Sequence, residues 1–411
     1  MNDGNEQLEQ TIDNTSAPQE AVDDRAAKLK TKKRKGMFLS LVSVALFAVA
    51  AGAGFLLFKS LEEKVDDSDP TGKIDDGGDV IVKAPGLTVV PTMLDTLSSD
   101  STWCGTFQLV WNDMKNELVG GDVVFNPQLP MVENLNKETF AVSMLSDSYY
   151  YKRWGKKTLE LKAEIERGIK DKFNEKSDVL DLIDWSEGAL DDSDNLGVDR
   201  YLFYVMLKRK FEYPKEFTKL SVGEFNGKAN VKYFGIDGTT KEEVKDQVEV
   251  LWYNSENDFA FVVGTKTDDE LVFIKSPEGN TFDAIYKNIG KKAGSFAGAR
   301  RLDEVDRLKI PNLDFDELRQ YDELAGQPFQ TKIGTGTIMA AIQTIRFSLD
   351  EKGGEVKSEA VIDVKDEAVA MPETPRYFYL DGTFALFIRE KGKSQPYFAA
   401  RVDDIEKFQS K

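Results

Sequence analysis

The last part of the chain constrains its fold most, because a charged, strand-like segment stands there among apolar ones. An apolar stretch covers residues 336–354, and a charged stretch, 355–376, follows it. Two further apolar stretches close the sequence at 377–390 and 393–404, with the turn residues Lys391-Gly392 between them. We interpret this order as one long mobile strand that lies between two buried ones.

The charged stretch has a period of two residues. Every second position from 354 to 364 is small or apolar: Gly354, Val356, Ser358, Ala360, Ile362 and Val364. The positions between them are nearly all charged, and this pattern is typical of a strand with one buried face. Pro372 and Pro375 then interrupt the strand and predict a loop. An ordinary surface strand followed by a loop would explain the same pattern.

Residues on both sides of this segment resemble the serpin family. The run from Asp350 to Glu355 resembles the hinge of a serpin reactive loop, and residues 378–388 and 396–402 resemble the C-terminal strand pair of that family. A serpin's reactive loop can insert as a new strand into the main sheet, and the inserted strand needs small or apolar residues at alternate positions. The stretch described above meets this requirement.

The resemblance implies a role for each part of the loop. The hinge would comprise Glu351, Gly353, Gly354 and Glu355. The face that enters the sheet would comprise Val356, Ser358, Ala360, Ile362 and Val364. By family spacing, the bond that a protease cleaves would lie at Glu367-Ala368, and an ordinary solvated loop at this bond remains the alternative.

Further matches follow in the family's order over most of residues 104–404. Residues 201–207 form an apolar run that is typical of a central strand covered on both faces. An amphipathic helix is predicted over 158–172. The resemblance implies an α+β fold with a large mixed β-sheet, packed helices and a C-terminal reactive loop. We expect it to form a single domain over 87–411.

The chain departs from the family pattern in four places. Asn126 stands where serpins have a serine, Phe203 replaces an asparagine, and Gln343 replaces a histidine. The interval 127–158 is also short, which predicts a trimmed domain. The departure at Asn126 puts in doubt the polar cluster that lies beneath the opening of the sheet in the family.

The N-terminal part is predicted to hold a membrane anchor. Residues 1–36 are polar and end in a basic cluster, and 37–58 carry no charge and are long enough to span a bilayer as a transmembrane helix. The basic flank predicts a cytoplasmic N-terminus, with the spacer 59–86 and the large domain extracytoplasmic at the cell membrane. A cleaved signal peptide is the alternative.

Composition excludes several function classes. The chain has no histidine, which rules out Ser/His and Cys/His catalysis and histidine-ligated metals within this chain. Its only cysteine, Cys104, allows no internal disulfide and is predicted to be a buried structural thiol. A net charge of −18 argues against nucleic acid as a partner. We expect no enzyme activity, no metal or cofactor and no small-molecule substrate.

Two functional hypotheses remain. The first is a membrane-anchored, extracytoplasmic serpin-like inhibitor of a serine or cysteine protease, which acts by loop insertion with Glu367 setting the preference of the bait bond. The second is a non-inhibitory serpin-fold binding or sensing module of the cell envelope. The altered hinge, Asn126 and Phe203 favour the second hypothesis.

Overall fold

The computed structural model describes residues 86–177, 179–185, 199–354 and 374–409. They belong to one unit, Ile81–Lys411, which separates from Met1–Val80. The predicted tail, the predicted anchor 37–58 and nearly all of the spacer lie outside the described residues. Among the helices of the described part, none has the length and apolar character needed to cross a membrane.

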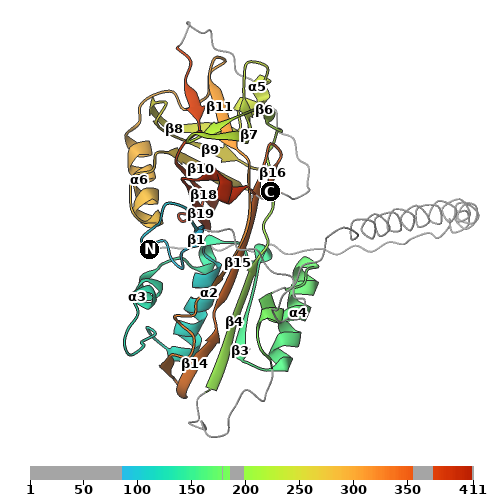
Figure 1. Ribbon diagram of the computed structural model, residues 1–411, viewed down its shortest axis with the longest axis vertical. Coiled ribbons are helices and arrows are strands. Elements are labelled where there is room, and N and C mark those ends of the chain that lie inside the picture. Colours follow the sequence, from blue (N-terminus) through green and yellow to red (C-terminus); the bar gives the residue numbers. More distant parts are fainter. Residues whose placement is uncertain (1–85, 178, 186–198, 355–373, 410–411) are drawn as a thin grey trace, which may run out of the picture. The chain divides into compact units, whose positions relative to one another are not determined.

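The largest sheet has seven strands and contains the predicted C-terminal strand pair (Figure 1). In spatial order its strands are β1 (Thr88–Val89), β2 (Ser101–Cys104), β19 (Phe398–Val402), β18 (Phe384–Glu390), β10 (Asp269–Lys275), β9 (Asp258–Gly264) and β8 (Val248–Ser255). β1 and β2 run parallel, and the other neighbours run antiparallel, so the sheet is mixed. The pairing of Phe384 with Val402 confirms the predicted strand pair.

Fully buried aromatic side chains form the core beside this sheet. The rings of Phe261 and Phe273 lie 5.0 Å apart, and those of Phe259 and Phe378 lie 5.3 Å apart. Phe378 belongs to a second, four-stranded sheet: β17 (Tyr377–Tyr379), β11 (Arg307–Pro311), β7 (Lys228–Ile236) and β6 (Thr218–Phe225). The core thus joins the two sheets through apolar burial.

A third group of strands carries the candidate site. One sheet has the order β13 (Pro328–Thr331), β14 (Gly334–Ala340), β4 (Asp199–Leu207) and β3 (Tyr150–Lys156). A two-stranded sheet joins β12 (Leu313–Gln320) to β15 (Ile342–Leu349), and another joins β16 (Gly353–Gly354) to β5 (Phe211–Glu212). Only Ala341 separates β14 from β15, so the two strands form one nearly continuous run.

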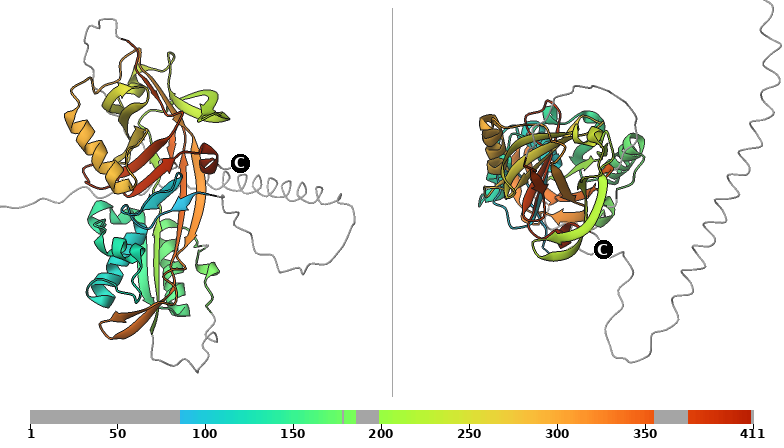
Figure 2. Two further views of the ribbon diagram at one scale, coloured as in Figure 1. Left: turned by 60° about the vertical axis from the view of Figure 1, so that its left-hand side comes forward. Right: turned by 90° about the horizontal axis from the view of Figure 1, so that it is seen from above.

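Helices cover β4 on both faces, as its apolar sequence predicts. α2 (Thr106–Asp113) continues as a π-helical segment, η1 (Met114–Val119), and its side chains cluster with Tyr201 and Phe203. α4 (Leu159–Phe173) clusters instead with Leu202 and Tyr204. Figure 2 shows the cyan helices and the green helix on different sides of the long strands. Alternate side chains of β4 therefore enter different cores.

Local signals explain where α4 begins and which face it buries. The hydroxyl of Thr158 accepts a hydrogen bond of 3.1 Å from the backbone of Leu161, which satisfies one free N–H of the first turn. The side chains of Leu161, Ile165 and Ile169 are buried at helical spacing. The prediction of an amphipathic helix over 158–172 is confirmed.

The remaining short elements connect these layers. They are α3 (Pro130–Lys137), η2 (Val142–Met144), η3 (Asp147–Tyr149), η4 (Val179–Leu182), α5 (Glu242–Lys245), α6 (Phe282–Ser295) and η7 (Ile405–Phe408). Between 127 and 158 the chain holds one α-helix, two short 3-10 turns and β3. The class is α+β with mixed sheets, as predicted.

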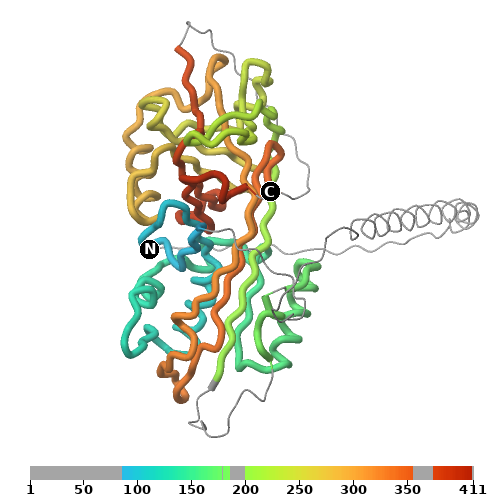
Figure 3. The backbone as a smooth tube through the Cα atoms, in the orientation of Figure 1, coloured from blue at the N-terminus to red at the C-terminus, as the bar shows by residue number. Residues whose placement is uncertain are grey.

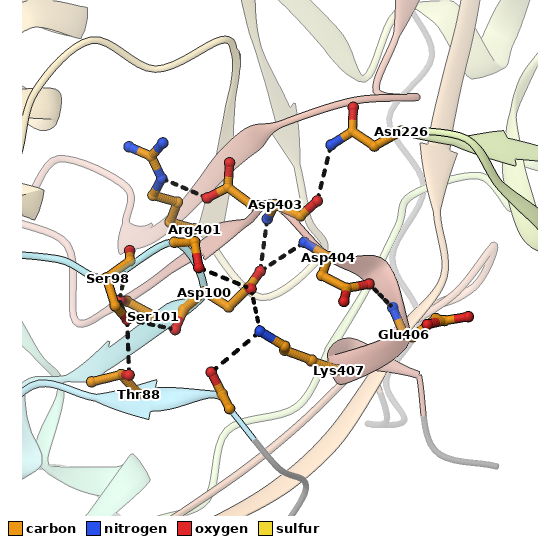
Figure 4. Close-up of polar contacts among 12 residues, drawn as sticks. Thr88, Ser98, Asp100, Ser101, Asn226, Arg401, Asp403, Asp404, Glu406 and Lys407 are labelled. Atoms are coloured by element: carbon orange, nitrogen blue, oxygen red, sulfur yellow. Dashed lines mark hydrogen bonds and ion pairs between the residues drawn. The ribbon is translucent and has the colours of Figure 1, made fainter.

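The C-terminal segment is held against the start of the domain by Asp100 (Figure 4). This buried carboxylate accepts hydrogen bonds of 2.8 Å from the backbone N–H groups of Asp403 and Asp404 and pairs with Lys407 at 2.7 Å. Asn226 donates to the carbonyl oxygen of Asp403 from the tip of the β6–β7 hairpin. One aspartate therefore ties β2 to η7.

Candidate functional site: a slot between β4 and β15

The candidate site is a slot between two long strands. β14 and β4 form a parallel ladder. It begins where Gly336 lies opposite Asp199 and ends where Ala340 lies opposite Leu202. Beyond Leu202 no ladder joins β4 to β15: among the described residues, β4 pairs only with β3 and β14, and β15 only with β12. Figure 3 shows β4 beside the β14–β15 run. Each strand keeps an edge toward the slot, and such edges can accept a further strand.

An open cavity follows the slot. It has a volume of about 580 Å³ and is lined by Met206 and Leu207 of β4 and by Thr344 and Phe347 of β15. Deeper in the domain, a small apolar cavity lies between α2 and the strands, with Trp111 and other apolar side chains in its lining. The space between the strands is therefore bounded by the same helix that packs on one face of β4.

Phe203 lies at the deep end of this slot, and it occupies the position where the resemblance expects asparagine. Its ring stacks on Trp154 of β3 with centroids 5.7 Å apart and planes inclined by 17°. Its side chain also lines the apolar cavity against α2. The contacts of this position are therefore apolar.

Gln343 supplies a polar cluster beneath the slot instead. Its amide nitrogen donates to the carbonyl oxygen of Cys104 and to the hydroxyl of Thr106, each at 3.1 Å. Its amide oxygen accepts a hydrogen bond of 2.8 Å from the Tyr321 hydroxyl. The amide is buried and its polar atoms are satisfied. Position 343 therefore belongs to a buried polar cluster even though glutamine stands where the resemblance expects histidine.

Cys104 is a buried thiol, as predicted from its apolar context. Burial raises the pKa of its thiol, so the thiolate is disfavoured at neutral pH. Among the described residues, no group of three or more acidic or cysteine side chains is placed to hold a metal ion.

A tight turn stands at the end of β15. The backbone N–H groups of Asp350 and Gly353 each donate to the other residue's carbonyl oxygen, at 3.0 and 3.3 Å. The Asp350 carboxylate accepts a further bond of 2.8 Å from the backbone of Lys352. After the turn, Gly353 lies opposite Glu212 and the next residue opposite Phe211, in antiparallel register. The turn has reversed the chain, which now runs beside β5 back toward β4.

Both glycines of this turn are required by its geometry. Gly353 has a φ of +123°, and a Cβ atom there would lie 2.3 Å from the carbonyl oxygen of Phe211. A Cβ atom on Gly354 would lie 2.8 Å from the carbonyl oxygen of Ser348. Only glycine allows the backbone to come this close to its neighbours. Whether these residues act as a hinge stays a prediction.

Glu351, a predicted hinge residue, is buried in the same turn. Its carboxylate pairs with Lys219 at 2.9 Å, and this hydrogen bond raises the pKa of Lys219. The carbonyl oxygen of Glu351 accepts a hydrogen bond of 2.9 Å from the backbone N–H of Phe217. The carbonyl oxygen of Lys352 accepts one of 3.0 Å from the backbone N–H of Tyr213. The turn is therefore attached to the segment that follows β5.

The other predicted loop residues lie outside the described part of the chain. They are Glu355, the inserting-face residues Val356, Ser358, Ala360, Ile362 and Val364, and the bond Glu367-Ala368. The structure describes the chain again from Thr374. There Arg376 pairs with buried Asp306 at 2.6 Å and donates to the carbonyl oxygens of Ala299 and Arg301. The chain is thus strongly anchored two residues beyond Thr374.

An ion-pair network that the sequence did not suggest fixes the chain between β4 and β5. Buried Arg209 pairs with Asp269 at 2.8 Å and with Glu390 at 2.5 Å, and its guanidinium lies 3.7 Å from the ring centre of Tyr149. The Tyr397 hydroxyl donates to Asp269 at 3.0 Å. Burial raises the pKa of Asp269 despite these partners. A lone arginine between two lysines gave no sequence signal, because both of its carboxylate partners are distant in the chain.

Comparisons with known proteins show structural likeness alone. No family model and no curated protein matches the chain. Solved structures similar to it include thyroxine-binding globulin in complex with thyroxine, at 13% identity and a TM-score of 0.41 over 75% of this chain and 93% of that one. Serpin48 of the insect Tenebrio molitor has 10% identity and a TM-score of 0.41 over 74% and 92%.

The thermophilic serpin Tengpin has 18% identity and a TM-score of 0.35 over 69% of this chain and 70% of that one. The similar structures thus include proteins named as serpins, the family that the sequence resembles.

Proposed function

We propose that this protein is a serpin-like inhibitor that traps a serine or cysteine protease by adding its own loop as a strand to the slot between β4 and β15. One observation supports this above the others. The turn at Asp350–Gly353 has already reversed the chain, and Gly354 lies opposite Phe211 at the mouth of the slot. The chain that follows Gly354 needs only to continue in this direction to enter.

The register of β16 with β5 specifies how the loop would enter. If it is kept, four loop residues come to lie beside β4 and the residues after it: Val356 opposite Arg209, Ser358 opposite Leu207, Ala360 opposite Val205 and Ile362 opposite Phe203. Phe203 packs with α2, whereas Leu202 and Tyr204 pack with α4. The four loop residues would therefore face the α2 side, where small or apolar side chains are needed.

The slot sets a limit on free insertion. Val364 would lie opposite Tyr201, a position that Ile338 of β14 already occupies. Insertion as far as Ile362 uses the existing gap, and further insertion requires β14 to separate from β4. Burial of Val356 and Ile362 would contribute about 1.5–3 kcal/mol each, in addition to about 0.5–1.5 kcal/mol net for each new backbone hydrogen bond.

This geometry supports the following inhibitory step. The protease nucleophile would attack the carbonyl carbon of Glu367, the amine of Ala368 would leave, and the acyl-enzyme would remain on the Glu367 side. Because Arg376 anchors the other side to Asp306, the two ends of the cut separate as the loop enters the slot. The enzyme would be carried along and distorted before water can release it. We also propose that residues 37–58 anchor the protein in the cell membrane with this domain extracytoplasmic.

The test uses the full chain mixed with a glutamyl endopeptidase and run on a denaturing gel. A band at the summed mass that survives boiling is expected. The variant Ala360→Arg places a charge on the α2 side and should convert the inhibitor into a substrate. The variant Glu359→Arg exchanges one charged residue for another on the α4 side and should still trap the protease. Clean cleavage with fully active protease would overturn the proposal for that protease.

A second candidate function is a non-inhibitory binding or sensing module. The observation in its favour is the pairing of β14 with β4 up to Ala340, together with the apolar Phe203–Trp154 stack at the deep end of the slot. The β14–β4 ladder and the Phe203–Trp154 stack both lie at the deep end of the slot, where full insertion would have to separate the strands. If cleavage of the loop leaves the melting temperature unchanged, this function is favoured.

A further inference from the structure

A large cationic cavity lies beside the turn at the end of β15. Its volume is about 760 Å³, within the range of small-molecule sites. Four separate segments line it: η3, the end of α4, the chain from 208 to 212 and the chain from 348 to 354. Its lysines come from three of these segments: Lys172, Lys208, Lys210 and Lys352.

The acidic residues of the cavity have other partners. Glu212 pairs with Lys266 at 3.0 Å, and Lys266 is not among the lining residues. Asp350 accepts the backbone N–H of Lys352 within the turn. The lining therefore has an excess of positive charge in a chain whose net charge is −18. Such a local reversal of charge favours an anionic ligand.

A carboxylate that pairs with one of these lysines shows that they act on anions. Glu175 pairs with Lys208 at 2.5 Å. The hydrogen bond and the charge of Lys208 lower the pKa of Glu175, with further contributions from Lys210 and Arg346. Lys208 also donates to the carbonyl oxygen of Phe173 at 3.3 Å. An anion placed among these lysines is stabilised in its charged form.

Aromatic side chains form the apolar part of the lining. They are Tyr149, Phe173 and Phe211. Tyr149 is supported by Arg209, and the ammonium of Lys172 lies 5.9 Å from the ring centre of Phe173. Tyr149 and Phe173 are partly exposed. A flat ring can stack on such surfaces while groups at its edge reach the surrounding lysines.

We propose that this cavity binds an aromatic polyanion, a flat ring system with several sulfonate, carboxylate or phosphate groups. The ring lies over Tyr149 and Phe173, and the anionic groups contact Lys172, Lys210 and Lys352. This inference goes beyond the proposed inhibition, because it concerns a ligand that no protease reaction requires.

The test titrates the full chain with 1,3,6,8-pyrenetetrasulfonate and follows fluorescence anisotropy. We expect saturable binding, and because the basic cluster within residues 1–36 is the same in every variant, the loss caused by the cavity variants reports on the cavity. The double variant Lys172→Gln/Lys352→Gln should weaken binding about tenfold or more, since each lysine contributes a charge-assisted hydrogen bond. The matched control Lys391→Gln/Lys393→Gln removes the same charge outside the cavity and should change affinity by about twofold or less.

Inorganic sulfate carries negative charge but has no ring. It therefore tests whether ring stacking contributes to binding in addition to the contacts with the lysines. It should compete only at far higher concentrations than unlabelled probe. Any of three results would overturn the proposal: no saturable binding, equal losses of affinity in both double variants, or sulfate that competes as well as the unlabelled probe. Thermal unfolding of each variant shows that it is folded, and Lys210→Gln provides an independent single change if the double variant is not.

Discussion

Ala340 of β14 lies opposite Leu202 of β4, and this pair is where the ladder between the two strands stops. Beyond this pair, β4 is paired with β3, and β15 is paired with β12. A bulge between Ile338 and Ala340 interrupts the register just before the ladder ends. The slot is therefore a consequence of where one ladder stops, and its length sets how much of the loop can enter without breaking existing bonds.

The α4 side of the proposed inserted strand contains an unfavourable charge. In the register of β16, Lys357 would lie beside Lys208 of the chain after β4, and Arg346 of β15 lines the same cavity as Lys208. We predict that Lys357→Glu removes this repulsion and favours insertion by about 1 kcal/mol, a rate increase of about fivefold. The measurement is the yield of boiling-resistant complex against cleaved protein.

The control for Lys357 is Lys365→Glu, which makes the same change of charge. Residue 365 lies beyond the part of the loop that fits the free slot, so its replacement should leave the yield unchanged. Equal effects of the two substitutions would indicate a general effect of net charge and contradict the register.

The turn that follows β15 should be intolerant of side chains. We predict that Gly353→Ala destabilises the domain by about 3 kcal/mol or more, because the positive φ is strained for alanine and the new Cβ meets the carbonyl oxygen of Phe211 at 2.3 Å. Gly334→Ala is the matched control, since its φ is +153° and its Cβ would have no atom within 4 Å. Urea unfolding of both variants separates backbone strain from steric contact, and equal losses would contradict the close approach.

The two buried ion pairs that Arg209 forms with Asp269 and Glu390 should contribute strongly to the free energy of unfolding. We predict that Arg209→Met costs about 3–5 kcal/mol, because it leaves two buried carboxylates without their cation. Arg153→Met, which removes the exposed pair with Glu164, should cost about 1 kcal/mol or less. Urea midpoints compare the two variants, and a small loss at Arg209 would show that the carboxylates find other partners or protons.

Acid should destabilise the domain partly through Asp381. Burial raises the pKa of this carboxyl, but its hydrogen bond from Lys275 and the charge of Lys309 outweigh that effect and lower it below 3.8. A lowered pKa in the folded state gives stability that is present above the unfolded value and is lost as the pH falls through the folded value.

We therefore predict that Asp381→Asn lowers stability at neutral pH by about 1 kcal/mol or less, since the group is partly exposed. The difference from the wild-type protein should shrink as the pH falls below about 4. Urea unfolding at several pH values measures this, and a difference that is independent of pH would count against the ion pair as its cause.

Much of the local structure could be predicted, because it depends on short-range pattern. Helix α4 follows from the spacing of Leu161, Ile165 and Ile169, and the two-sided burial of β4 follows from its continuous apolar run. The pairing of β18 with β19 follows from two apolar stretches around a turn. The loop between 355 and 373 remains a prediction, since it lies outside the described residues.

The candidate site could be predicted only in part. The hinge motif located the turn at Glu351 and Gly353, but the sequence did not show that both glycines of the turn are packed against neighbouring carbonyl oxygens. The departure at Asn126 suggested the loss of a polar cluster, whereas the structure builds one from Gln343 with Cys104, Thr106 and Tyr321. That cluster joins residues more than 200 positions apart, so no local pattern signals it.

The sequence by itself determined the elements of this protein and the faces that they bury, because a period of 2 or 3.6 residues sets which side chains share a face. It also excluded histidine chemistry through the absence of that residue. Only the tertiary structure decided where the ladder between β14 and β4 stops, which carboxylates neutralise Arg209 and how lysines from separate segments surround one cavity. These features depend on which distant segments meet, and the packing of the whole domain determines that.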